Sequence, residues 1–399
     1  EGFLKGDYDL GDMGEAIQHF GHRYFPSLFQ APASRVPVKE NFVFGLKLGN
    51  ADKVLPYFMK GFSGMDNSQF SGSMNTLTDS LNLTADVPEL GYDKYQFNDI
   101  SLRVGGKAQG LGTQTDIGEI LVQDSVLLPS LSLKTASAQD TTYVNVKTAG
   151  AAALNNADLY ARVISLKDGY NVKILNSELV VNDKTWNIAP DNEITLRKSG
   201  VTVHNFSIAH ADQKITLASN PSDTTAASFV IRLQHLYLAD FAQFFFTNPA
   251  LEGVADGTIV VDNPLGDMKA TAHIDASQLR VNDDSLGRVS AVAGYDKRLE
   301  TVQWDVSKTD DPSRNFSVRG AMGLGKTHKT LQGDFQLNHT DLSVLGTFIG
   351  DYVSEFTGYG TGTLKLGGDR DNPDVTGSIR LDSVGMKVNY LGTYYTLSG

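Results

Sequence analysis

The chain has 399 residues, and 41% of them are hydrophobic, which is too high a fraction for a disordered chain. Its formal net charge is −12 and no basic cluster stands out, so no nucleic-acid partner is expected. It contains no cysteine, which excludes disulfides, thiolate catalysis and Cys-ligated zinc. No apolar run approaches the ~18 residues of a membrane-spanning helix, so any anchor is expected to lie outside this sequence.

Residues 1–41 are expected to form a helical and loop segment. Ile17 and Phe20 have the spacing of one helix face, and three prolines between residues 26 and 37 interrupt any helix after them. His19 and His22 lie one turn apart on the same helix. No third histidine is near in sequence, so the pair favours a solvated helix face over a metal site.

From about residue 42 onward, apolar and polar residues alternate with the period of a half-buried β-strand. For example, Phe229, Ile231 and Leu233 alternate with Val230 and Arg232. Glycine and proline turn signals separate the alternating runs at short intervals. Strands with one apolar face are typical of antiparallel or groove-like sheets. On this pattern alone, an ordinary β-sandwich with a closed core is the main alternative.

A strand, a short helical stretch and a glycine-bearing strand recur in that order three times. The helical stretches are expected at residues 52–60, 238–246 and 343–356. The repeats differ in length, so they indicate a degenerate module. We therefore expect a first β-groove region over residues 42–228, a second module over residues 229–333, and a third over residues 334–399 that continues beyond this sequence.

The third module has the most specific pattern. Residues 360–368 read Gly-x-Gly-x-Leu-x-Leu-x-Gly, a Pro-x-x-x-Gly turn spans residues 373–377, and a Tyr-Leu-Gly-Thr-x-Tyr stretch spans residues 390–395. This region resembles the AsmA-like repeat of TamB-family proteins, the inner-membrane-anchored subunits of the translocation and assembly module. Residues 229–281 match the same outline more loosely, and residues 42–104 more loosely still.

The resemblance implies an all-β chain, folded as an elongated, U-shaped, taco-like β-sheet groove with a few short helices. It implies a periplasm-spanning bridge that carries phospholipid between the inner and outer membranes of a Gram-negative bacterium. The inner-membrane anchor would lie outside this sequence, and the partner would be an Omp85-family outer-membrane barrel. The alternative is an assembly factor for outer-membrane proteins that acts with such a barrel. Neither reading requires a catalytic residue or a cofactor.

The shared period-2 spacing, taken with the family's groove, predicts which side chains would line that groove. The expected lipid-groove residues are Phe229, Ile231, Leu233, Ile259, Val261, Val302, Trp304, Val306, Phe316, Val318, Leu364, Leu366, Ile379 and Leu381.

Two polar motifs are typical of nucleotide or calcium binding, but the residues around each motif favour a structural role. Residues 320–327 satisfy the P-loop pattern G-x-x-x-x-G-K-T, yet the residues that follow alternate as in a strand, whereas a phosphate cradle needs a helix. A P-loop or β-solenoid enzyme is therefore a minor hypothesis. Asp369, Asp371 and Asp374 could bind calcium, but a polar hairpin tip is the favoured interpretation.

Overall fold

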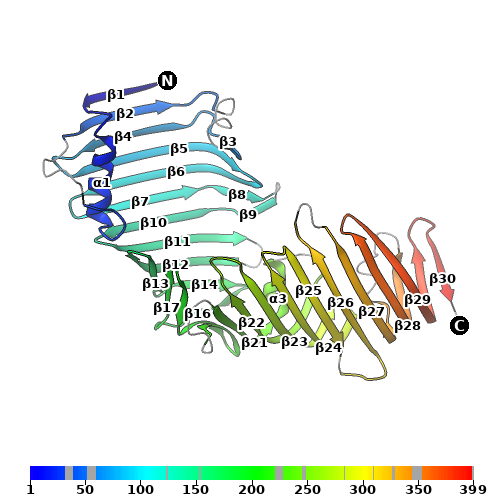
Figure 1. Cartoon of the computed structure of the whole chain (residues 1–399). Coiled ribbons are helices and arrows are strands. Elements are labelled where there is room, and N and C mark those ends of the chain that lie inside the picture. The colour runs from blue at the N-terminus through cyan, green and yellow to red at the C-terminus, as the bar shows by residue number, and fades with distance from the viewer. Residues whose placement is uncertain are drawn as a thin grey trace. The chain divides into compact units, whose positions relative to one another are not determined.

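The computed structural model describes residues 1–31, 39–51, 60–122, 125–151, 154–220, 228–244, 249–282, 284–308, 310–325, 329–343 and 353–397. About 70% of the chain is strand and 6% is helix, which confirms the all-β class. The strands form two large antiparallel sheets that do not close on themselves. The chain divides into two compact units, Glu1–Lys198 and Ser199–Gly399 (Figure 1).

The main ladder of the first unit runs through neighbouring antiparallel pairs. Its strands, in order, are β1 (Gly2–Asp7), β2 (Asn41–Lys47), β4 (Gln69–Asn75), β5 (Ser80–Tyr92), β6 (Tyr95–Lys107), β7 (Gly110–Ile117), β10 (Leu131–Ala138), β11 (Thr141–Ala151), β12 (Leu154–Leu166), β13 (Gly169–Ile174) and β17 (Glu193–Arg197). Shorter strands flank this ladder: β3 (Phe62–Gly64), β8 (Glu119–Val122), β9 (Ser125–Leu128), β14 (Glu178–Val181) and β15 (Lys184–Thr185). The short strand β16 (Asn187–Ile188) also lies in this unit but does not belong to this sheet.

The second unit opens with the short strand β18 (Gly200–His204), after which a sheet of hairpin-connected strands follows the chain order. These strands are β19 (Phe206–His210), β20 (Gln213–Ser219), β21 (Ser228–Tyr237), β22 (Leu251–Asp262), β23 (Lys269–Val281), β24 (Asp284–Asp296), β25 (Thr301–Lys308), β26 (Asn315–Gly323), β27 (Leu331–Asp341), β28 (Val353–Asp369), β29 (Asn372–Val388) and β30 (Thr393–Leu397). Each strand pairs with the next, so most contacts in this sheet are between sequence neighbours.

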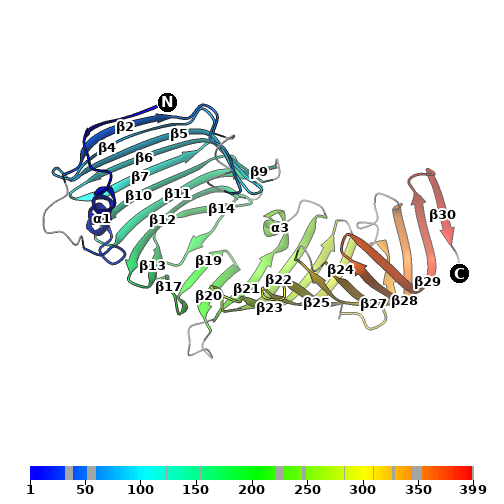
Figure 2. The ribbon, with the colours of Figure 1, turned by 45° about the horizontal axis from the view of Figure 1, so that its top comes forward.

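Helix α1 (Met13–Tyr24) crosses one end of the strands of the first sheet (Figures 1 and 2). Its buried side chains Ala16, Phe20 and Tyr24 pack against Phe42 and Met74 of the sheet. This apolar stripe explains why the helix forms here, because burial of one face stabilises an otherwise marginal helix. The helix ends at Tyr24, because the next residue, Phe25, precedes Pro26, and a following proline disfavours the helical conformation.

The expected helical stretches have three outcomes. Helix α3 (Leu238–Phe241), continued by the 3-10 turn η1 (Ala242–Phe244), confirms the stretch at residues 238–246 where the structure describes it. Residues 52–59 and 344–352 lie outside the described residues. Residues 353–356 were expected to be helical, and this was wrong, because they begin strand β28 and pair with β29. Local apolar spacing is outweighed there by the cross-strand partner.

β-Bulges recur at one end of the second sheet. Register shifts occur near the end of β21, the start of β22, the end of β23, the end of β27 and the start of β28. Because successive strands run in opposite directions, all of these positions fall at the same strand end. Several bulge residues have positive φ, among them His235, Gly253, Gln278, His339 and Gly358. Bulges increase the local twist, so the sheet bends along this end.

The two units do not coincide with the expected modules. The boundaries expected at residues 42, 229 and 334 fall inside the units, and α1 packs on the sheet that follows it. The three modules therefore remain a prediction about a repeated local pattern.

Candidate functional site

Cross-strand pairing places all fourteen expected groove residues on one face of the second sheet, because directly paired residues of antiparallel strands share a face. We call this face the second apolar face. One row of successive partners across nine strands contains Leu233, Gly257, Ile274, Ala291, Val306, Val318, Phe335, Leu364 and Gly377. The neighbouring row on the same face contains Ile231, Ile259, Ala272, Ala293, Trp304, Gly320, Gly333, Leu366 and Val375.

The opposite face of the same sheet is polar. A row of successive partners across eight strands consists of Asp256, Asp275, Ser290, Ser307, Ser317, Gln336, Thr363 and Ser378. Another row pairs Asp305 with Arg319, then Arg319 with Asp334, and Asp334 with Lys365. In that row, Arg319 Nε donates to the carboxylate of Asp305 at 2.8 Å. The sheet therefore has one face suited to water and one that is not.

The second apolar face is only half-buried. Of the fourteen residues, Val261 alone is buried, at 8% exposure, and the other thirteen have intermediate exposure. In a β-sandwich the inner face of each sheet packs against a second sheet, and its central side chains lose nearly all contact with water. Within the described part of the second unit, no second sheet covers this face. An apolar surface of this extent marks a binding surface in most soluble proteins.

Among the described residues of this unit, the apolar face is covered only along the bulged strand end. There Ala276, Leu279 and Val289 form a small buried cluster, against which Leu238 of α3 packs. Further along the same end, Leu342 is 1% exposed and lies close to Gly360 of β28. Short segments after β21 and β27 therefore seal parts of one strand end and leave the middle of the face uncovered.

The first unit has a comparable face that the sequence pattern did not single out. A row of successive partners contains Leu46, Phe70, Ala85, Leu102, Thr115, Leu133, Val146 and Leu159. We call the face that carries this row the first apolar face. The signal was available, since Leu81, Leu83, Ala85 and Val87 alternate with polar residues. Helix α1 packs on this face at one strand end.

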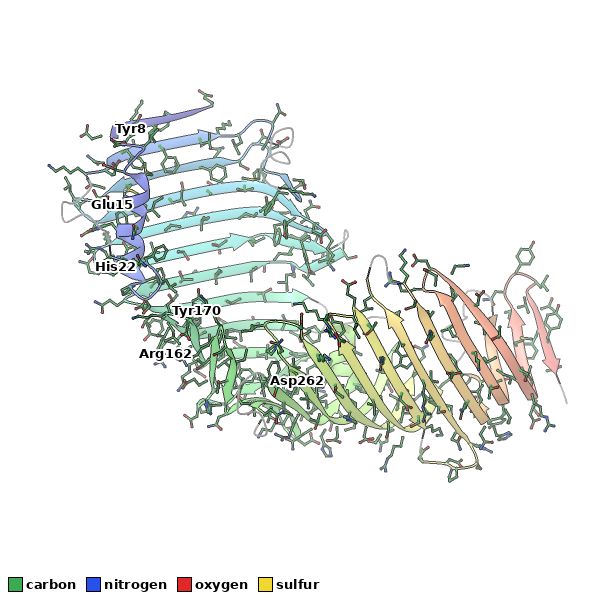
Figure 3. All side chains as sticks on the ribbon, in the orientation of Figure 1. Tyr8, Glu15, His22, Arg162, Tyr170 and Asp262 are labelled. Atoms are coloured by element: carbon green, nitrogen blue, oxygen red, sulfur yellow. The ribbon has the colours of Figure 1, made fainter. Side chains whose placement is uncertain are left out.

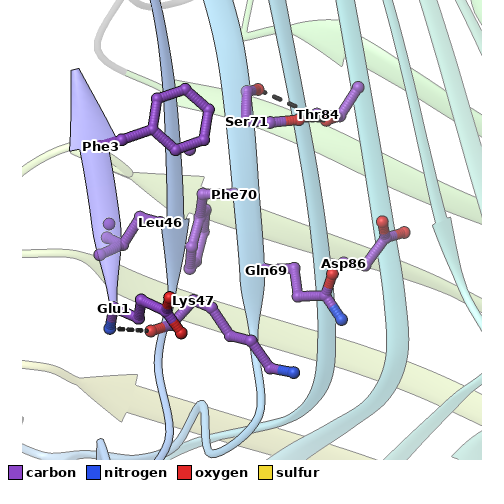
Figure 4. A pocket seen from close by; sticks show the side chains of 11 residues that line it. Glu1, Phe3, Leu46, Lys47, Gln69, Phe70, Ser71, Thr84 and Asp86 are labelled. Atoms are coloured by element: carbon purple, nitrogen blue, oxygen red, sulfur yellow. Dashed lines mark hydrogen bonds between the residues drawn. The ribbon is translucent and has the colours of Figure 1, made fainter. Parts of the chain in front are cut away.

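An open pocket of about 460 Å³ lies at the β1 edge of the first sheet (Figure 4). Phe3 lies over Gly45 there, and Lys47, Gln69 and Asp86 contribute polar side chains. Cross-strand register places these residues on the polar face of the sheet. The pocket is a depression beside the sheet edge, and Leu46 and Phe70 of the first apolar face also belong to its lining.

Carboxylates of the second unit stay ionised through local hydrogen bonds. The Arg288 backbone N–H and the Lys308 ammonium lower the pKa of Asp310. The hydroxyl and backbone N–H of Ser313 lower the pKa of Asp311. In the first unit, hydrogen bonds from Ser132 and Gln114 lower the pKa of Asp116 on the polar face. None of these shifts gives a general acid or base that titrates near neutral pH.

The histidine pair and the aspartate cluster, which could have bound a metal ion, instead contact other groups of the chain. On α1, whose Glu15 and His22 are labelled in Figure 3, His19 Nε2 lies 3.0 Å from the Asp79 carboxylate, and His22 Nδ1 lies 2.8 Å from the Phe29 carbonyl oxygen. At the tip between β28 and β29, Asp371 forms an ion pair with Lys329. Among the described residues, no group of three His, Asp or Glu side chains is arranged to hold a metal ion.

The glycine-rich motif at residues 320–327 begins inside strand β26. Its Lys326 and Thr327 lie outside the described residues. Strand β27 follows from Leu331 and pairs with β26, in place of the long helix that a phosphate-binding loop requires.

Comparisons with family models, with curated proteins and with solved structures find no match to this chain. In the part of the chain that the structure describes, no helix is both long enough and apolar enough to cross a membrane.

Proposed function

We propose that this chain is part of a TamB/AsmA-like bridge that carries phospholipid along an apolar β-sheet face across the periplasm. In this proposal it is anchored in the inner membrane by a segment outside this sequence and reaches the outer membrane of a Gram-negative bacterium. Its proposed protein partner is an Omp85-family barrel. The proposal involves neither a catalytic step nor a cofactor, and U-shaped curvature of the sheets would give the groove its depth.

The observation that carries the proposal is the half-buried state of the second apolar face across its neighbouring strands. Acyl chains need a continuous apolar surface, because each methylene removed from water contributes about 0.8 kcal/mol. A face that runs from strand to strand lets a lipid exchange one set of apolar contacts for the next without passing through water. The polar reverse face keeps such a sheet soluble.

The test is to place a charge on the second apolar face and measure lipid transfer. Leu364→Asp and Ile379→Arg should block transfer of a fluorescent phospholipid between donor and acceptor vesicles. Both side chains are half-exposed, so the new charge can reach water and the circular dichroism spectrum should stay close to that of the parent.

Lys365→Asp is the matched control, because Lys365 neighbours Leu364 on the same strand and points to the polar face. It should leave transfer unchanged. Transfer that survives in both apolar-face variants would contradict the proposal. Capture of unfolded outer-membrane protein strands on the face, with no lipid transfer in the parent chain, would support the assembly-factor alternative.

A further inference from the structure

A small pocket of about 190 Å³ lies at the bulged end of the second sheet, between the part sealed by α3 and the part sealed by Leu342. Its lining comes from the ends of five strands and the turn before β26: Ser285, Leu286, Lys308, Asp311, Arg314, Phe316, Thr340, Asp341 and Tyr359. Phe316 also belongs to the second apolar face, so the pocket and the face are continuous. The pocket is smaller than the ~300 Å³ of a site for a drug-sized ligand.

Arg314 is held in this pocket by stacking. Its guanidinium lies over the Tyr359 ring, 5.0 Å from the centroid, and His339 stacks on Tyr359 with centroids 4.3 Å apart. No carboxylate in the described part of the chain forms an ion pair with Arg314. A guanidinium positioned by an aromatic ring keeps its N–H donors free for an anion, and its planar fork matches a phosphate group.

Lys308 brings a second cation to the pocket. It is the partner of Val289 in the register of the second apolar face, and its side chain is 18% exposed. Its ammonium donates to the Leu286 carbonyl oxygen at 2.6 Å and lies 2.9 Å from the Asp310 carboxylate. These contacts fix its position, so Lys308 adds positive potential at the end of the apolar face while Arg314 offers the free donors.

Two carboxylates complete the lining. Asp311 accepts hydrogen bonds from the Ser313 backbone N–H and hydroxyl, which hold it in the ionised form. Asp341 is exposed and accepts a hydrogen bond from the Ser343 backbone N–H. A pocket with both signs of charge is complementary to a group that carries both signs, and its acids repel a purely anionic headgroup.

We infer that this pocket binds the headgroup of a zwitterionic phospholipid whose acyl chains lie on the second apolar face. Arg314 binds the phosphodiester, Asp311 and Asp341 face the ammonium group, and Phe316 contacts the start of an acyl chain. The inference rests on the proposed lipid function and adds a headgroup preference to it. The pocket lies between two covered stretches of the strand end. It is therefore the place along this end where a lipid headgroup can remain in water.

The test is lipid binding to the full chain, with phosphatidylethanolamine, phosphatidylglycerol and an uncharged diacylglycerol that carry the same fluorescent acyl chain. The parent should bind phosphatidylethanolamine most tightly. Arg314→Gln should weaken binding of both phospholipids about tenfold, the loss of one charge-assisted hydrogen bond, and leave binding of the uncharged diacylglycerol unaffected. Arg314→Lys should recover part of that loss. Asp341→Asn should reduce the preference for phosphatidylethanolamine over phosphatidylglycerol.

Arg380→Gln removes an exposed arginine from the polar face and is the matched control, which should change none of these affinities. Unchanged phospholipid affinity in Arg314→Gln, with normal binding by the parent, would overturn the headgroup site and leave the proposed function standing. Binding of none of the three lipids by the parent would overturn the proposed function itself. Competition by millimolar inorganic phosphate as strong as that by phosphoethanolamine would show a site for free phosphate and overturn the zwitterionic assignment.

Discussion

The two apolar faces differ in what covers them. On the first, the twelve-residue helix α1 seals one strand end through a cluster that includes Phe20, Tyr24 and Met74. On the second, the four-residue helix α3 contributes Leu238 beside a cluster of three buried residues, and thirteen of the fourteen expected groove residues keep partial contact with water. The same period-2 pattern thus gives a closed core under α1 and a half-buried surface elsewhere, since in the row from Leu46 to Leu159 of the first apolar face only Ala85 is buried. The segments between strands decide where a core closes.

The largest expected effect comes from placing a charge on a covered and on an uncovered position. Met74→Asp puts a carboxylate under α1, where Met74 is 8% exposed. It should lower the free energy of unfolding by about 3–5 kcal/mol, because the buried charge has no partner. Val318→Asp, at a half-buried position of the second apolar face, should lower the free energy of unfolding by about 1 kcal/mol. Urea unfolding of the full chain measures both. Equal destabilisation would mean that the second face at Val318 is as closed as the first face is under α1.

A smaller effect is expected at the bulges that bend the second sheet. Gly358 has φ of +104°, and a Cβ there would lie 2.7 Å from the Ser383 carbonyl oxygen. Gly358→Ala should therefore cost about 1–3 kcal/mol through backbone strain. Gly294→Ala is the control, since a Cβ at Gly294 meets nothing within 4 Å and should be neutral or slightly stabilising. Equal unfolding midpoints for the two variants would contradict the role of the Gly358 bulge in bending the sheet.

The smallest expected effect is pH-dependent. The pKa of Asp310 is lowered in the folded chain, so its contribution to stability is present above the unfolded value near pH 4 and is lost as the pH falls through the folded value. Asp310→Asn should lower the free energy of unfolding by at most about 1 kcal/mol at pH 7, because solvent screens the pair, and by less as the pH falls toward 2. Unfolding curves at both pH values test this, with Asp374→Asn as an exposed control. A loss of equal size at both pH values would contradict the assignment.

Most strands, and the face on which each side chain lies, could be predicted from local sequence. Alternation of period 2 fixes which side chains of one strand share a face, and Phe229, Ile231 and Leu233 show it directly. Gly253 lies near the start of β22 and Gly358 lies within β28, and both have positive φ at bulges. Family membership and the lipid role remain predictions, because no residue pattern in the chain requires them.

Other features depend on contacts between residues distant in sequence. Residues 353–356 have apolar spacing that fits a helix, but pairing with β29 makes them a strand. The division at Lys198 has no composition signal, since it separates two stretches of similar strands. Arg314 and Tyr359 are 45 positions apart, and only the register of β26, β27 and β28 brings them together. Local periodicity cannot encode such pairings.

In the proposed function, the uncovered apolar face, and no other surface of the second sheet, contacts lipid. Photo-crosslinking tests it most directly, with a photoreactive residue placed at Leu364 or Ile379 and, one position along each strand, at Lys365 or Arg380. In membranes containing phospholipid, positions 364 and 379 should capture lipid and positions 365 and 380 should not. Equal labelling of both faces, or of neither, would contradict the account and favour a closed β-sandwich.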